Sequence, residues 1–205
     1  MKNYLVVSFY TEGFYEKVAN SYLIPSLKEF NIPYYIEKLP SQKNWNHNTN
    51  LKPYFCLKML EKFPDKKLVW IDADSRVVND PEMFNLNYEL GVVYISWKVW
   101  FNYRKNIENK KELISNVIMF KNTDIVKKIF VEWQKGTQNR PFVWEQKHLE
   151  NAVDKYLSEI NLLTLSEGYS YFDTLPNGTK PNVKIIPIIK QYQISRKTKR
   201  NPELL

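Results

Sequence analysis

Cysteine and histidine are scarce in this chain. Cys56 is the one cysteine of the sequence, so the chain cannot form an internal disulfide, and this suits a reducing, cytoplasmic location. The two histidines, His47 and His148, are too few for a histidine-based metal centre. Because no cysteines and histidines cluster, the sequence also argues against a structural zinc site.

Long apolar runs and flexible linkers are absent as well. No apolar run is long enough for a transmembrane helix. The apolar stretch within residues 1–10 is too short for a signal-peptide core and has no cleavage site of small residues. With 43% hydrophobic residues the chain can bury a substantial core. We therefore expect one domain over residues 1–194, followed by a basic tail over residues 195–205.

Positive charge exceeds negative charge, with a formal net charge of +8. Basic residues gather in the segments 98–111 and 196–200. Such clusters can face phosphates, an anionic membrane surface or nucleic acid, and they can also form an ordinary solvated surface. Peripheral contact with an anionic membrane is therefore one expectation from the charge.

The segment 68–74 combines a short apolar run with an acid pair. Its first four residues have the β-branched and aromatic character of a buried strand, and Asp72 and Asp74 follow directly. Two carboxylates are too costly to bury unpaired, so we expect them at the end of the strand, with small Ala73 allowing the chain to bend. Oxygen ligands suit a hard ion such as Mn²⁺ or Mg²⁺. Alternatively, Arg76 and nearby lysines could balance these charges without a metal.

Apolar periodicity predicts alternating strands and helices. Predicted strands lie at 4–9, 32–36, 68–71, 91–96, 114–120, 161–165 and 183–189. Predicted helices lie at 12–30, with a kink or break at Pro25, at 51–63, after an N-cap at Thr123, and at 144–157. Strands that alternate with helices indicate an α/β sandwich with a largely parallel sheet.

Five segments in this order resemble the GT-A class of nucleotide-sugar glycosyltransferases. They are Ser8-Phe9-Tyr10-Thr11, Trp45-Asn46-His47-Asn48 with Lys52-Pro53, Val69-Trp70-Ile71-Asp72-Ala73-Asp74, the strand 114–122 with Trp144-Glu145-Gln146, and Gln193-Ile194-Ser195-Arg196-Lys197. The resemblance spans nearly the whole chain. It implies a single-domain GT-A (Rossmann-like) sandwich with a mixed, mostly parallel central sheet flanked by helices.

The resemblance also implies an activity. Such an enzyme transfers a sugar from a nucleotide-diphosphate sugar, with a UDP-sugar as the default donor, to a hydroxyl acceptor such as a glycan. Mn²⁺ or Mg²⁺ would bind Asp72 and Asp74. Relatives often carry a histidine where this chain has residues 190–192, so phosphates and water would complete the metal shell. Asn116-Val117 stands where many relatives have a glycine, which implies a differently shaped donor pocket.

Individual roles follow from the charge that develops on the leaving diphosphate, which must be neutralised in the transition state. Lys52 and Arg196 are candidates to bind the pyrophosphate, although either could be a surface residue. The predicted donor contacts are Ser8, Tyr10 and Thr11 for the nucleotide, and Ser115, Asn116 and Gln146 for the sugar. The aromatic and basic loop 97–111 suits an acceptor or a closing lid, and could equally pack on the core.

Glu145 is the candidate base for the acceptor hydroxyl. A single base on the acceptor side favours inversion of the anomeric centre. As an acid in the first turn of a helix, Glu145 could instead only stabilise the helix.

Two other functions fit parts of the sequence. An acid pair in basic surroundings also occurs in metal-dependent nucleic-acid enzymes, but these usually need three or four acids, and Asp80 and Glu82 fall after the strand. We therefore expect no nucleic-acid partner. Six tryptophans and fourteen tyrosines also fit a non-catalytic module that binds carbohydrates or sugar nucleotides.

Overall fold

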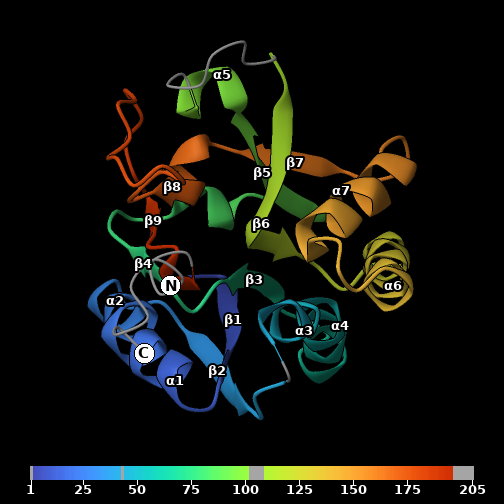
Figure 1. Ribbon diagram of the computed structural model, residues 1–205. Helices are drawn as coiled ribbons and strands as arrows, with labels where there is room; N and C mark the ends of the chain where they lie inside the picture. Colours follow the sequence, from blue (N-terminus) through green and yellow to red (C-terminus); the bar gives the residue numbers. More distant parts are fainter. Residues whose placement is uncertain (1, 43, 102–108, 196–205) are drawn as a thin grey trace.

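A six-stranded mixed sheet forms the centre of the computed structural model, which describes residues 2–42, 44–101 and 109–195 (Figure 1). The strand order is β2-β1-β3-β6-β5-β7. Five strands run in one direction, and β6 runs antiparallel to its neighbours β3 and β5. The bounds are β1 (Tyr4–Thr11), β2 (Tyr34–Leu39), β3 (Lys67–Ile71), β5 (Leu90–Ser96), β6 (Lys111–Phe120) and β7 (Leu162–Leu165). The predicted mixed, mostly parallel sheet is confirmed.

Strand β3 is buried along its whole length. Its side chains alternate between two cores, with Val69 and Ile71 on one face of the sheet and Leu68 and Trp70 on the other. A continuous apolar run is the pattern expected of a strand covered on both faces. The acid pair therefore follows the most protected part of the sheet.

Three helices cover one face of the sheet. They are α4 (Lys52–Lys62), α6 (Asp124–Asn139) and α7 (Glu145–Lys155), and short α3 (Trp45–Thr49) precedes α4. The Thr123 side chain accepts a hydrogen bond from Val126 N at the start of α6, as predicted. Helix α6 packs on α7, where Gly136 leaves room for the His148 ring. This contact fixes the helix that carries Glu145.

The other face is covered by mixed elements. Helices α1 (Phe14–Ser21) and α2 (Leu23–Glu29) precede a small sheet of order β4-β9-β8. Its strands are β4 (Ser75–Val77), β8 (Tyr171–Phe172) and β9 (Ile189–Gln191), and the short helices α5 (Trp97–Trp100), η1 (Glu82–Asn85) and η2 (Glu167–Ser170) lie nearby. The small sheet joins the chain just after the acid pair to the residues near position 190.

Two predicted elements differ from the structure. The helical segment 12–30 breaks at Tyr22, and Pro25 lies in the first turn of α2, where a missing N–H is tolerated. The predicted strand 183–189 is wrong except for Ile189, which begins β9. Residues 183–188 instead pack as irregular chain, and the backbone of Ile186 lies so close to Gly168 that a side chain at Gly168 would collide with it.

None of the helices in the described part of the chain is both long enough and apolar enough to cross a bilayer.

Candidate functional site

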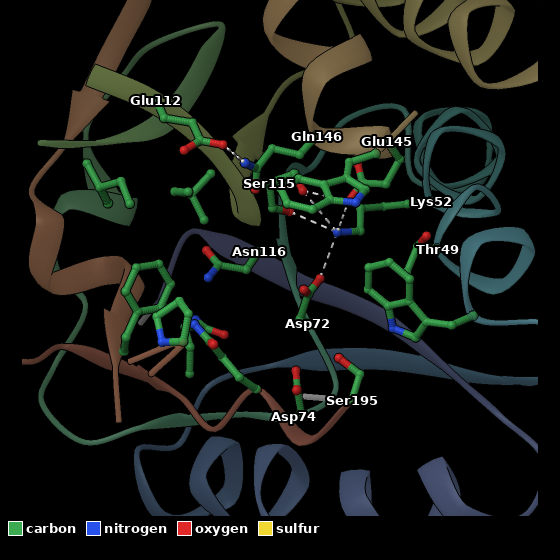
Figure 2. Close-up of a pocket in the computed structure, with 18 of the residues that line it drawn as sticks. Thr49, Lys52, Asp72, Asp74, Glu112, Ser115, Asn116, Glu145, Gln146 and Ser195 are labelled. Carbon is green, nitrogen blue, oxygen red and sulfur yellow. Dashed lines mark hydrogen bonds and ion pairs between the residues drawn. The ribbon is translucent and has the colours of Figure 1, made fainter. Parts of the chain in front are cut away.

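Two adjoining cavities open where β1 and β3 end. Figure 2 shows residues that line the larger one. The larger has a volume of about 360 Å³ and the smaller about 120 Å³. They share a wall of six residues: Trp45, Thr49, Lys52, Asp72, Asp74 and Ser195. The carboxyl ends of strands are the usual ligand site of open α/β sheets.

Asp72 is held at the end of β3 by its backbone and by its side chain. Its N–H donates to Asn116 O at 2.9 Å, and its carbonyl accepts from Ser75 N at 3.1 Å as the chain turns. Its Oδ1 accepts a hydrogen bond from Trp70 Nε1 at 2.7 Å and lies 2.9 Å from Lys52 Nζ. Among the described residues nothing bonds to Oδ2, which leaves this oxygen to a ligand.

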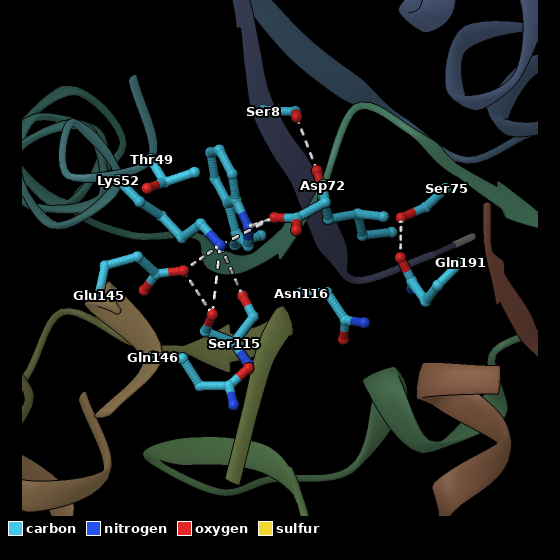
Figure 3. Close-up of polar contacts among 12 residues, drawn as sticks. Ser8, Thr49, Lys52, Asp72, Ser75, Ser115, Asn116, Glu145, Gln146 and Gln191 are labelled. Carbon is cyan, nitrogen blue, oxygen red and sulfur yellow. Dashed lines mark hydrogen bonds and ion pairs between the residues drawn. The ribbon is translucent and has the colours of Figure 1, made fainter. Parts of the chain in front are cut away.

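Asp74 is held by a segment distant in sequence. Its Oδ2 accepts a hydrogen bond from Ile194 N at 2.9 Å, and its carbonyl accepts one from Tyr192 N at 3.1 Å. Next to it, Ser75 Oγ donates to Gln191 Oε1 at 2.5 Å (Figure 3). Burial, and secondly the charge of Asp72, raise the pKa of Asp74 to about 6. A buried carboxylate whose pKa is raised, next to a second carboxylate, favours a bound cation.

Lys52 lies at the centre of the site, at the start of α4 (Figures 2 and 3). Its Nζ lies 2.9 Å from Asp72 Oδ1, 2.9 Å from Glu145 Oε1 and 3.1 Å from Ser115 O. Burial by itself would lower the pKa of Lys52, but the charges of Asp72 and Glu145 outweigh it and raise the pKa above its ordinary value. Lys52 therefore stays charged and joins two acids that come from different elements.

Glu145 is buried at the first position of α7. Its Oε1 accepts from Ser115 Oγ at 2.6 Å as well as from Lys52, and its carbonyl accepts from Trp133 Nε1 at 2.8 Å. Burial raises the pKa of Glu145 although Lys52 opposes this. Its Oε2 is buried and has no hydrogen-bond partner among the described residues. Glu145 is thus a fixed carboxylate with one oxygen left for a ligand.

A chain of hydrogen bonds continues from Glu145 along the wall of the larger cavity. Ser115 N donates to Gln146 Oε1 at 3.4 Å, and Gln146 Nε2 donates to Glu112 Oε1 at 2.9 Å. The other oxygen of Glu112 accepts from Trp97 Nε1 at 2.6 Å. The amide of Gln146 is thereby oriented from both sides.

The structure brings most of the predicted site residues to these cavities. Tyr10 and Thr11 line the smaller one, and Ser115, Asn116, Glu145 and Gln146 line the larger one. Ser8 lies apart from both, because its Oγ donates to Ile71 O at 2.6 Å inside the sheet. Arg196 and most of the predicted basic tail lie outside the described residues, as do residues 102–108 of the loop 97–111.

Sequence reasoning missed Glu112, and it marked residues 190–192 only as the place where relatives carry a histidine, with no contact assigned to Gln191. Glu112 lies one residue beyond the loop that we singled out, and its role depends on the pairing of β5 with β6. Gln191 and its neighbours reach the acids only through the small sheet. Neither position carries a local sequence signal.

The described lining of the larger cavity is strongly acidic. Four carboxylates (Asp72, Asp74, Glu112 and Glu145) and one ammonium give a formal charge of −3 when all are ionised. No group of three or more His, Cys, Asp and Glu suited to a metal occurs among the described residues. Asp72 and Asp74 nevertheless fit a hard cation that takes its other ligands from water and from a bound molecule.

Comparison with known proteins identifies the fold. No family model and no curated protein matches the sequence. A crystal structure of a glycosyltransferase involved in the glycosylation of the major capsid of PBCV-1 is similar, with a TM-score of 0.62, 13% identity and 98% of each chain covered. The chain has the fold of a glycosyltransferase.

Two further solved structures agree. The galactosyltransferase LgtC, in complex with donor and acceptor sugar analogues, gives a TM-score of 0.55 at 12% identity, with 98% of this chain and 94% of that chain covered. GlyE of Streptococcus pneumoniae TIGR4 gives 0.57 at 12% identity, with 92% of this chain and 55% of that chain covered. The predicted GT-A fold class is confirmed.

Proposed function

We propose that this protein is a metal-dependent glycosyltransferase that moves a sugar from a nucleotide-diphosphate sugar to a hydroxyl acceptor. One observation carries the proposal: Asp72 and Asp74 lie in the wall shared by two cavities, in a chain with a glycosyltransferase fold. The smaller cavity suits a nucleoside and the larger one a sugar with its acceptor. The shared wall is where the diphosphate between them would lie.

The donor would extend across both cavities. Tyr10 can stack on the base and Thr11 can bond to the ribose or a phosphate, with UDP as the default nucleotide. The transferred sugar would lie against Ser115, Asn116 and Gln146. Asn116 supports this placement because its Oδ1 is buried without a partner among the described residues. A pyrophosphate contact from Arg196 remains a prediction.

Asp72 and Asp74 would hold Mn²⁺ or Mg²⁺. When bound, such an ion would supply positive charge to the leaving diphosphate as a Lewis acid. The need for such charge follows from the acidic lining, since a cavity of formal charge −3 repels a diphosphate. Lys52 cannot supply it alone, because its ammonium already faces two carboxylates.

Glu145 is the proposed base. In the transfer, the bond between the anomeric carbon and the diphosphate oxygen breaks, a bond to the acceptor oxygen forms, and the acceptor hydroxyl loses its proton. Glu145 Oε2 has no partner in the described structure and can accept that proton, while Lys52 and Ser115 hold Oε1. Attack from the side opposite the diphosphate inverts the anomeric centre.

The acceptor end of the larger cavity has mixed chemistry. Trp97, Phe101 and Phe172 provide apolar surface, and Glu112 and Gln146 provide polar groups beside it. A pyranose ring has apolar faces and hydroxyl edges, so a glycan acceptor matches this wall.

Donor turnover with the acid-pair variants tests the proposal. Asp72→Asn and Asp74→Asn should each abolish Mn²⁺-dependent turnover of nucleotide sugars while circular dichroism shows an unchanged fold. The exposed Asp65→Asn is the matched control and should behave as wild type. Full activity of either acid-pair variant in excess EDTA would contradict the proposal. Donor binding with no hydrolysis or transfer by wild type would favour a binding module, and a salt-dependent electrophoretic shift would favour a nucleic-acid enzyme.

A further inference from the structure

An exposed apolar loop joins α6 to α7. It contains the consecutive residues Pro141, Phe142, Val143 and Trp144. Phe142 is 77% exposed and Trp144 is 60% exposed, although both rings are large and apolar. Water disfavours such a cluster, so a contiguous exposed patch of this kind indicates a partner surface.

The loop lies at the mouth of the candidate active site. Asn50 Nδ2 donates to Pro141 O at 3.0 Å and so ties the loop to the junction of α3 and α4. Tyr54 on α4 and Trp45 on α3 are also exposed, and both Trp45 and Trp144 line the larger cavity. We call Trp45, Tyr54, Phe142, Val143 and Trp144 the apolar rim.

Outside the cavity, the charges that flank the loop 141–144 are positive, paired or turned inward. Arg140 is exposed just before the loop, and its guanidinium makes no ion pair among the described residues. Lys147, on the first turns of α7, pairs with Glu150 at 2.6 Å. The acid nearest the loop, Glu145, points inward to Lys52. The outer charge of the loop therefore complements an anionic surface.

We propose that the apolar rim docks on the surface of an anionic phospholipid bilayer. Tryptophan and phenylalanine beside basic residues are the side chains that partition into the boundary between headgroups and acyl chains. Arg140 contacts the lipid phosphates, and the net charge of +8 adds long-range attraction to the same surface. Docking places the cavity mouth against the membrane, where an acceptor hydroxyl on a lipid-linked molecule can enter. This last step rests on the proposed transferase function, whereas the docking does not.

Vesicle co-sedimentation of the full chain tests the docking. We expect binding to vesicles of phosphatidylcholine mixed with phosphatidylglycerol, and much weaker binding to phosphatidylcholine alone. Phe142→Ser should weaken binding to the mixed vesicles by about tenfold or more. The control is Ile186→Ser, because Ile186 is 74% exposed, lines neither cavity and lies next to Gly168 rather than in the loop between α6 and α7. Arg140→Gln should reduce the preference for vesicles that contain phosphatidylglycerol, and it should leave binding to phosphatidylcholine vesicles unchanged.

Three outcomes would overturn the docking proposal: wild type that does not sediment with anionic vesicles, equal losses for Phe142→Ser and Ile186→Ser, or a dimer in light scattering that Phe142→Ser converts to a monomer. Phe142 lines neither cavity, so its variant should keep donor turnover in solution, which shows that it is folded. Vesicle binding without any donor turnover by wild type would instead count against the proposed function and leave the docking supported.

Discussion

Lys52 lies between two carboxylates to which the proposed reaction gives different tasks. The sequence predicted a contact between Lys52 and the pyrophosphate, and the structure places its ammonium 2.9 Å from both Asp72 and Glu145. One cation thereby links the proposed metal site to the proposed base. The effects of substituting Asp72 and Glu145 should therefore not be additive, because the two acids share Lys52 as a partner.

Glu145→Gln tests the base. We expect turnover to fall by about a hundredfold or more, the usual contribution of a positioned general base, with donor binding kept. Because Lys52 loses one of its two charged partners, unfolding free energy should also fall by about 1–2 kcal/mol. That exceeds the loss of under about 1 kcal/mol expected for an exposed first-turn acid.

Transfer rate and melting temperature of this variant measure both effects. Glu132→Gln, which breaks surface pairs of α6 with Lys135 and with Lys155 of α7, is the control and should keep normal turnover. An NMR spectrum of the product that shows a retained anomeric configuration would remove Glu145 from the role of base.

Asp74 predicts a pH-dependent stability of the metal-free protein. Its pKa is raised from 3.8 to about 6, so the folded state binds this proton more tightly than the unfolded state does. The stabilisation is complete below about pH 4 and is lost as the pH rises through 6, a change on the order of 3 kcal/mol. Urea unfolding in EDTA from pH 4 to pH 8 measures it as the difference between wild type and Asp74→Asn. A difference that stays constant with pH would refute the assignment.

At the scale of elements, patterns formed by neighbouring residues predicted strands and helix ends well. The apolar run of β3 and the Thr123 cap of α6 depend only on neighbouring residues, and both are confirmed. Strands β4 and β9 are three residues long and pair with each other across more than a hundred positions, so no local pattern marks them. The strand predicted at 183–188 is wrong because this apolar segment does not form the hydrogen bonds that pair one strand with another.

The same distinction applies to the candidate site. The acid pair could be found from the sequence because the strand before it is recognisable. The link from Lys52 to Glu145 joins positions 93 apart and could not be found without the fold.

Gly136→Ala tests how α6 supports α7. A methyl group at Gly136 would lie 2.7 Å from His148 Nδ1 and 2.8 Å from its Cγ, so the helices must separate or the ring must move. We expect unfolding free energy to fall by about 1–3 kcal/mol, despite the higher helix propensity of alanine. Turnover should fall too, because Trp133 on α6 holds the Glu145 carbonyl. Chemical denaturation together with transfer assays measures both losses, and a more stable variant would show that the helices do not pack as described.

At the scale of the whole molecule, the charge distribution predicts that the ligands bind cooperatively. The protein carries a net charge of +8, yet the described lining of its larger cavity is acidic. We expect Mn²⁺ and a nucleotide sugar to bind cooperatively. Donor at a hundred times its Kd should stabilise the fold by about 2.7 kcal/mol and raise Tm by roughly 5–10 °C.

A thermal-shift screen of nucleotide sugars, with Mn²⁺ and with EDTA, measures this effect and identifies the nucleotide and sugar. Asp72→Asn serves as the control that should abolish the joint shift. A nucleotide sugar that stabilises the protein equally in EDTA would contradict the proposed metal dependence.

The hydrogen bond between Asp74 and Ile194 has a consequence for protein synthesis. The two residues are 120 positions apart, so the ribosome makes the acid loop long before it makes the segment that clamps it. At about 5–20 residues per second, the delay is roughly 6–24 seconds. During that interval the nascent chain can form its central strands but carries Asp74 without its backbone partner. A chain released before residue 194 would therefore carry the acid pair without the backbone partner of Asp74.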